Sequence, residues 1–156
     1  MALPKLDTPT YQLELPANQQ VIKYRPFLVK EQKILIMAQD ADNKEDTYSM
    51  LSEIIDGCTF NTIDISTMPL FDFEYLFMQI RCKSVGESAE VSVLCPDDNI
   101  TRVPVTIDLS EVDVQIEDTH NNVIGVNENI KIIMKYPTVN DIKDVNDAEV
   151  LKNAMK

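Results

Sequence analysis

The stretch Met68–Cys95, MPLFDFEYLFMQIRCKSVGESAEVSVLC, joins a helical pattern to an alternating one and decides the fold class. Pro69 suits the first turn of a helix, and Gly86 stands where the helical pattern ends. Asp72 near the start and Lys83 near the end match the signs of the helix macrodipole. Beyond the glycine, apolar residues alternate with polar ones, which is typical of a strand. The stretch therefore predicts an α+β protein in which an apolar central helix leads into antiparallel strands.

The predicted central helix carries apolar side chains around most of its circumference. Phe73, Phe77 and Ile80 share one face, which we expect to form the core of the protein. A second stripe, with spacings of four, three and four, consists of Phe71, Tyr75, Met78 and Cys82. A helix that is apolar on all sides either is buried between two layers or meets another protein with its second stripe. Phe71, Tyr75 and Met78 are therefore candidate contacts with a partner.

An N-terminal region, residues 1–86, is predicted to combine a β-hairpin with helices. The predicted elements are strands at 11–15 and 21–25, helices at 29–39 and 47–57, and the central helix. Gly57 is expected to end the second helix, because glycine readily adopts the left-handed conformation that follows a helix.

Residues 87–136 are predicted to form an antiparallel β-meander. The predicted strands lie at 91–95, 103–107, 112–116, 123–126 and 130–136. The turn Pro96-Asp97-Asp98-Asn99 separates the first two strands, because proline, aspartate and asparagine are typical turn residues.

Residues 137–156 are predicted to begin a C-terminal helical region. Asn146-Asp147 is a suitable cap for a helix with an apolar face of Val150, Leu151, Ala154 and Met155. The sequence stops at Lys156 after about two and a half turns, and isolated helices of this length are marginal in water. Either the helix folds back on the domain, or the natural chain continues past Lys156. Leu151 and Met155 are further candidate partner contacts.

Composition excludes several classes of function. The 156 residues carry 26 acidic and 14 basic side chains, a net charge of -12, which repels the phosphates of nucleic acid. No apolar run approaches the ~20 residues that span a bilayer, so we expect no membrane insertion. The N-terminus lacks the pattern of a secretory signal, and three cysteines cannot all pair, so we expect a reducing, cytoplasmic site of synthesis.

Four residues are of the types that zinc prefers and are candidate metal ligands, namely Cys58, Cys82, Cys95 and His120. None of them has a second ligand two to four residues away, which structural zinc sites normally require. Buried structural thiols are the favoured interpretation, with no metal and no other cofactor. The sequence also lacks nucleophile, dinucleotide-binding and phosphate-binding motifs, so we predict no enzyme activity and no small-molecule substrate.

Several long stretches resemble the T4-type bacteriophage baseplate protein family. They are LPKLDTPTYQLELPANQQVIKYRPFLVKEQKILIMA at 3–38, MLSEIIDGCTF at 50–60, PLFDFEYLFMQIRCKSVGE at 69–87 and VSVLCPDD at 91–98. The resemblance implies a viral protein of a contractile tail, made in the host bacterial cytoplasm and possessing residues beyond Lys156. It also implies that the partners are other proteins of the tail and baseplate hub.

Two roles within this resemblance differ physically. A permanent subunit of the baseplate hub would bury a large apolar interface, whereas a hub-assembly chaperone would use a more polar and reversible one. The acidic composition favours the chaperone. Repulsion between copies keeps the free protein soluble, and its acidic surface can shield a basic partner until assembly. The alternative from another class is a small cytoplasmic ligand- or metal-binding protein.

Overall fold

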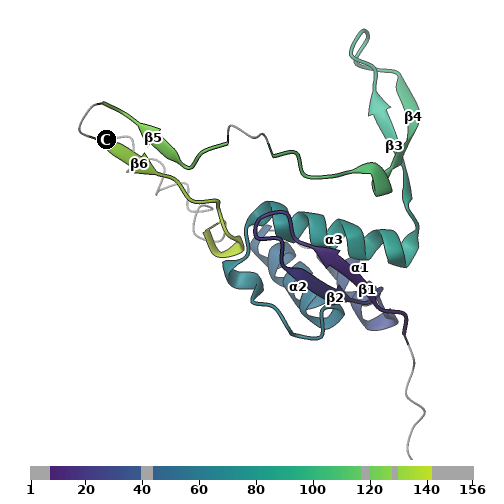
Figure 1. The fold of residues 1–156 in the computed structure, drawn as a ribbon. Coiled ribbons are helices and arrows are strands. Elements are labelled where there is room, and N and C mark those ends of the chain that lie inside the picture. Colours follow the sequence, from purple (N-terminus) through teal and green to yellow (C-terminus); the bar gives the residue numbers. More distant parts are fainter. Residues whose placement is uncertain (1–7, 40–43, 117–119, 128–129, 142–156) are drawn as a thin grey trace, which may run out of the picture.

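The computed structural model describes residues 8–39, 44–116, 120–127 and 130–141 (Figure 1). Its helices are α1 (Val29–Gln39), α2 (Lys44–Cys58) and α3 (Leu70–Val85), with short 3₁₀ turns η1 (Ile65–Thr67) and η2 (Leu109–Glu111). Its strands are β1 (Tyr11–Glu14), β2 (Val21–Tyr24), β3 (Ser88–Leu94), β4 (Arg102–Asp108), β5 (Val123–Gly125) and β6 (Lys131–Ile133). Helices and antiparallel strand pairs occur together, so the predicted α+β class is confirmed.

The N-terminal hairpin packs on the helices through one of its faces. β1 and β2 are antiparallel, with Tyr11 opposite Tyr24 and Leu13 opposite Ile22. Ile22 and Tyr24 are only 3% and 2% exposed, because alternate residues of a strand point to the same side. The hairpin therefore covers the helical layer.

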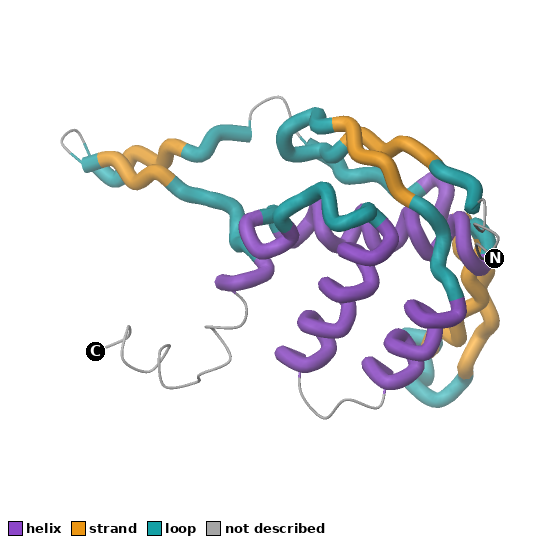
Figure 2. Tube along the Cα trace, turned by 90° about the horizontal axis from the view of Figure 1, so that it is seen from below, coloured by secondary structure: helices purple, strands orange, loops and turns teal. Residues whose placement is uncertain are grey.

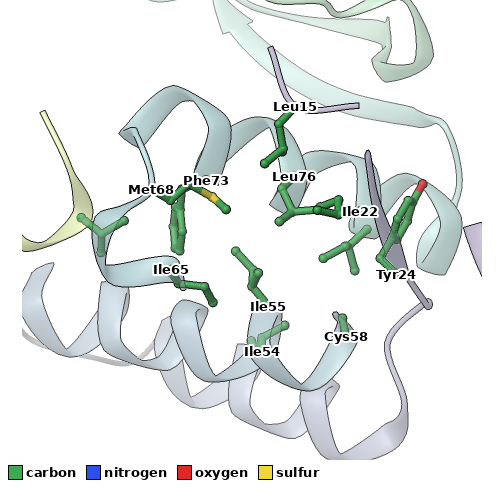
Figure 3. Close-up of a cluster of buried hydrophobic side chains, with 12 residues drawn as sticks. Leu15, Ile22, Tyr24, Ile54, Ile55, Cys58, Ile65, Met68, Phe73 and Leu76 are labelled. Atoms are coloured by element: carbon green, nitrogen blue, oxygen red, sulfur yellow. The ribbon is translucent and has the colours of Figure 1, made fainter. Parts of the chain in front are cut away.

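The core lies between this hairpin, α2 and α3 (Figure 3). α1 and α2 lie side by side (Figure 2), and α3 closes the core from the other side. Phe73 and Ile80 are fully buried, as predicted, whereas Phe77 is only half-buried and contacts the ring of Phe27 at the core's edge. The buried apolar cluster consists of Leu15, Ile22, Tyr24, Ile54, Ile55, Cys58, Ile65, Met68, Phe73, Leu76, Ile80 and Val139.

A buried ion pair joins the hairpin to α1. The Nη2 atom of Arg25 lies 2.9 Å from Oε1 of Glu31, and the other carboxylate oxygen accepts the Leu28 N–H at 2.8 Å. Glu31 therefore caps the first turn of α1 as well as neutralising Arg25. Burial opposes ionisation of Glu31, but the hydrogen bonds from Arg25 and Leu28 outweigh it and lower the pKa of this carboxyl.

The prediction that Gly57 ends α2 in a left-handed conformation is wrong. The helix continues to Cys58, and the residues with positive φ are Phe60 and Asn61, at 60° and 53°. A Cβ atom at Gly57 would lie 3.0 Å from the carboxylate of Glu31. Glycine suits this position because the buried ion pair approaches the helix closely, and a larger residue would require the Glu31 carboxylate to move.

The central helix ends as the sequence predicts. α3 stops at Val85, and Gly86 follows with φ of 128°, a conformation that side chains other than glycine rarely adopt. The chain turns there and enters β3 within two residues. Among the helices that the structure describes, none has both the length and the apolarity needed to traverse a bilayer.

The strands of residues 87–136 form two separate hairpins, β3–β4 and β5–β6. They project beyond opposite ends of α3 (Figure 1). The predicted strand at 112–116 is wrong, because this segment belongs to neither sheet and the Asp113 carboxylate instead accepts the N–H of Val114 at 2.8 Å. Such a local hydrogen bond competes with strand pairing.

The chain returns to the core after β6. The Leu70 N–H donates to the Pro137 carbonyl at 2.9 Å, and Val139 is buried in the core cluster. Thr138 and Asp141 form a reciprocal cap, which starts a helical turn at 139–141. The predicted helix at 146–155, with Leu151 and Met155, lies outside the described residues.

Candidate interaction surface

The β3–β4 hairpin has one apolar face and one polar face. The apolar face consists of three cross-strand pairs, namely Ala89 with Ile107, Val91 with Val105 and Val93 with Val103. The opposite face carries Ser88, Glu90, Ser92 and Leu94 from β3, and Asp108, Thr106, Pro104 and Arg102 from β4. Val91 and Val93 are 38% and 48% exposed, although valines on such a face are normally covered. No described element lies over the apolar face.

The two free edges of this hairpin differ. Hydrogen bonds from Leu109 N to Glu87 O and from Cys95 N to Thr101 O close the ladder at 2.7 and 2.8 Å. In an antiparallel ladder, hydrogen-bonded pairs alternate with pairs that are not hydrogen-bonded. The pair Ser92–Pro104 is of the second kind, so the nitrogen of Pro104 faces away from β3. The outer edge of β4 therefore lacks a donor there, whereas β3 offers a complete outer edge.

The β5–β6 hairpin is apolar on both faces. Ile124 lies opposite Ile132, and Val123 lies opposite Ile133. All four side chains are exposed, Ile133 to 75%. A single two-stranded hairpin is at best marginally stable in water, so its exposed apolar side chains make β5–β6 a second candidate contact surface.

An aromatic cluster packs the segments that precede β5 and follow β6, the stem of this hairpin, against the N-terminal end of α3. The ring of Phe71 meets that of Tyr136 edge-on at 4.9 Å, and His120 stacks on Tyr136 at 5.7 Å. A cavity of about 440 Å³ lies beside them, lined also by Val114, Gln115 and Ile116. Phe71 thus contacts its own chain.

The surface around β3–β4 is strongly acidic. Over residues 87–116 the only basic side chain is Arg102, against Glu87, Glu90, Asp97, Asp98, Asp108, Glu111 and Asp113. Hydrogen bonds from Thr101 and Ile100 lower the pKa of Asp98 to about 2, and those from Ser110 lower that of Asp108. The hairpin therefore combines an uncovered apolar face with ionised carboxylates at its tip and on its reverse.

We call residues 87–116 the first arm and residues 120–136 the second arm. Each combines exposed apolar side chains with a hairpin that lacks a described covering layer. Uncovered apolar surface of this kind marks sites of protein–protein contact.

Comparison with models of known protein families identifies the family of this chain. The model of the T4 bacteriophage base plate protein family matches residues 8–156. The chain belongs to this family. The comparisons with curated proteins and with solved structures found no match. Family membership confirms the resemblance seen in the sequence, and it gives the protein a role in the phage baseplate, in contact with other baseplate proteins.

In this baseplate protein the four candidate zinc ligands are not brought together. No cluster of three or more His, Cys, Asp or Glu side chains suited to a metal occurs in the part of the chain that the structure describes. Cys58 and Cys82 are buried, and burial raises the pKa of both thiols, that of Cys58 to about 11. Cys95 lies at the end of β3, and His120 is exposed on the second arm. Protonated, buried thiols act as small apolar side chains.

The other candidate partner contacts lie on α3. Tyr75 and Met78 are half-buried, as is Phe71. Their contact with another baseplate protein stays a prediction. The arms are the more exposed surface, and the sequence signal that could have located them is the alternation of Val91, Val93, Val103 and Val105 in a region with many carboxylates.

Proposed function

We propose that this chain is a non-enzymatic component of the baseplate hub and acts through its two arms. The observation that carries the proposal is the uncovered apolar face of β3–β4, supported by the equally exposed β5–β6 hairpin. Permanent interfaces between subunits are large and apolar, resembling a protein core divided in two. The helical core would hold the arms in place, and neighbouring tail proteins would cover them.

A hub-assembly chaperone is the second candidate. The acidic first arm favours it, because a highly charged surface suits reversible binding to a basic partner. Both candidates place the newly made protein in the cytoplasm of the host bacterium. They differ in whether the protein remains in the finished tail.

The distinguishing experiment measures the protein in purified tails. Mass spectrometry with isotope-labelled standards would compare its amount in finished tails and in assembly intermediates. We expect a fixed ratio to the other baseplate proteins in finished tails. Its presence in intermediates and absence from finished tails would instead identify a chaperone.

A pair of variants tests whether the arms make the attachment. Val91→Asp with Val105→Asp places two carboxylates on the apolar face of β3–β4, whereas Ser92→Asp with Thr106→Asp places them on the polar face. In phage whose own gene is silenced, we expect the first variant to be absent from tails and the second to be incorporated. Equal incorporation would show that the apolar face is not an attachment surface. Circular dichroism of both purified variants checks that the helical core is intact.

A further inference from the structure

We infer that the apolar face of β3–β4 binds an apolar segment of a different tail protein that is flanked by lysine or arginine residues. The inference rests on the proposed function, and it specifies the chemistry of the partner. It follows from three properties of the first arm, which are its uncovered face, its charge and its two unequal edges.

The face is large enough to anchor a segment of partner chain. Its three cross-strand pairs run along five residues of each strand, so the face extends roughly 17 Å. Its members are β-branched apart from Ala89, and such side chains have few rotamers to lose on binding. A partner segment that covers them need supply only complementary apolar side chains.

The charge around the face identifies the partner as basic. Asp97 lies at the tip of the hairpin, Glu90 and Asp108 on its reverse, and Glu111 at its base. Residues 87–116 contain one basic residue, Arg102, and Lys83 of α3 pairs with Glu87 at the base of the hairpin, at 2.6 Å. Lysine or arginine on the partner would be attracted by this excess of negative charge, which accelerates association and favours one orientation of the complex.

The same charge opposes a second copy of this chain. Two first arms stacked through their apolar faces would join two segments that each carry seven acidic residues and one basic residue over 87–116. Like charges juxtaposed at an interface are strongly unfavourable. The net charge of -12 adds repulsion between whole copies.

The edges indicate where the partner backbone can pair. Pro104 removes a donor from the outer edge of β4, and the outer edge of β3 is free in the described structure. A partner strand could therefore extend the sheet along β3 while its neighbouring residues cover the apolar face.

Site-specific cross-linking tests the inference. Benzoylphenylalanine is introduced in place of Val103 on the apolar face or, as the matched control, in place of Thr106 on the polar face of the same strand. Phage tails assembled with each protein are irradiated, and the cross-linked peptides are identified by mass spectrometry. We expect position 103 to capture an apolar peptide of another tail protein with flanking lysine or arginine, and position 106 to capture it poorly.

Every other pattern overturns the inference. These are capture of a second copy of this chain, capture of a peptide without basic residues, stronger capture from position 106, and no capture from position 103. The amount of protein in the tail is measured on the same samples, and it tests the proposed function separately. Protein present in tails without the expected cross-link refutes the inference alone, whereas absence from finished tails refutes the permanent hub role.

Charge removal provides an independent kinetic test with the partner that the cross-link identifies. Glu90→Gln, Asp97→Asn and Glu111→Gln together remove three of the seven acidic charges of the first arm and leave its apolar face unchanged. We expect association with the purified partner to slow about tenfold at low salt, with the difference fading near 1 M salt. The control, Glu14→Gln, Glu53→Gln and Glu74→Gln, removes the same number of charges from exposed positions on β1, α2 and α3 and should change the rate less than about twofold. Equal rates for the two variants would overturn the inference.

Discussion

The hairpins β1–β2 and β3–β4 have the same alternation of apolar and polar residues but different surroundings. Ile22 and Tyr24 of the first are buried against the helices, whereas Val91 and Val93 of the second are 38% and 48% exposed. Alternation fixes which side chains share a face of a hairpin, but it does not specify what covers that face. In β1–β2 the cover comes from the same chain, and in β3–β4 we propose that it comes from another protein.

The largest expected effect is on the covered side of this comparison. Phe73→Ala should lower the free energy of unfolding by about 3–5 kcal/mol, because Phe73 is 1% exposed and its removal leaves a cavity beside Tyr48. Chemical denaturation monitored by circular dichroism measures the loss. The matched variant Val93→Ala in the first arm should cost less than about 0.5 kcal/mol. Similar losses in both variants would mean that Val93 is as well covered as the core residue Phe73.

Two ion pairs on the first helix sharpen the contrast between covered and uncovered groups. Glu31→Leu leaves Arg25 without its buried partner and should cost about 3 kcal/mol. Glu53→Leu breaks the exposed pair with Lys30, at 3.5 Å, and should cost less than about 1 kcal/mol. Thermal melts at neutral pH provide the measurement.

The ion pair between Arg25 and Glu31 should make the stability of the protein depend on pH. The pKa of Glu31 is lowered in the folded protein, so its stabilising contribution is complete above the unfolded pKa and is lost as pH falls through the folded pKa. The difference in stability between Glu31→Leu and the wild type should therefore shrink in acid. A difference that grows in acid would contradict this assignment.

Asp72 is expected to show the opposite pH dependence. Its Oδ1 accepts the Ala17 N–H at 3.1 Å, but its buried Oδ2 has no hydrogen bond within the described structure, and burial raises the pKa. A raised acid pKa means that stability falls as pH rises from the unfolded to the folded value. Asp72→Asn should therefore add about 1 kcal/mol at pH 7, with a smaller gain in acid where Asp72 is protonated. Melting curves across this pH range would show a constant gain if burial of the charge were not the cause.

The smallest expected effect on stability is in the first arm. Val103→Thr with Val105→Thr should change the unfolding free energy of the core by less than about 0.5 kcal/mol, since both side chains are exposed. Hydrogen exchange of α2 and α3 would measure it. Loss of protection in these helices would show that the first arm belongs to the cooperative core.

Much of the fold could be predicted because the decisive patterns are local. The periodicity around Phe73 and Ile80, the glycine at 86 and the turn at 96–99 each involve neighbouring residues. The role of Gly57 could not be predicted, because it depends on Glu31, which is 26 positions away in the sequence and close only in the fold. The strand predicted at 112–116 failed for the same reason, since strand formation requires a partner that the pattern does not supply.

The candidate surface was predicted less well than the fold. The second apolar stripe of α3 predicted that Phe71 contacts a partner, but in the structure its ring packs against that of Tyr136. Tyr136 lies nearby only because the chain returns to α3 after β6. The exposed state of the arms could not be read from their sequence either. The same valines would predict a buried face had the chain provided a layer to cover them.

The length of α3 has a consequence for the geometry of the baseplate. The first arm leaves at its C-terminal end, after Gly86, and the stem of the second is attached at its N-terminal end through Phe71 and Leu70. Sixteen residues of helix span roughly 24 Å, so the length of α3 sets the distance between the two points of attachment. Proteins bound to the two arms would therefore be held at a fixed distance from each other. One helical turn inserted in α3 would move them about 5 Å farther apart.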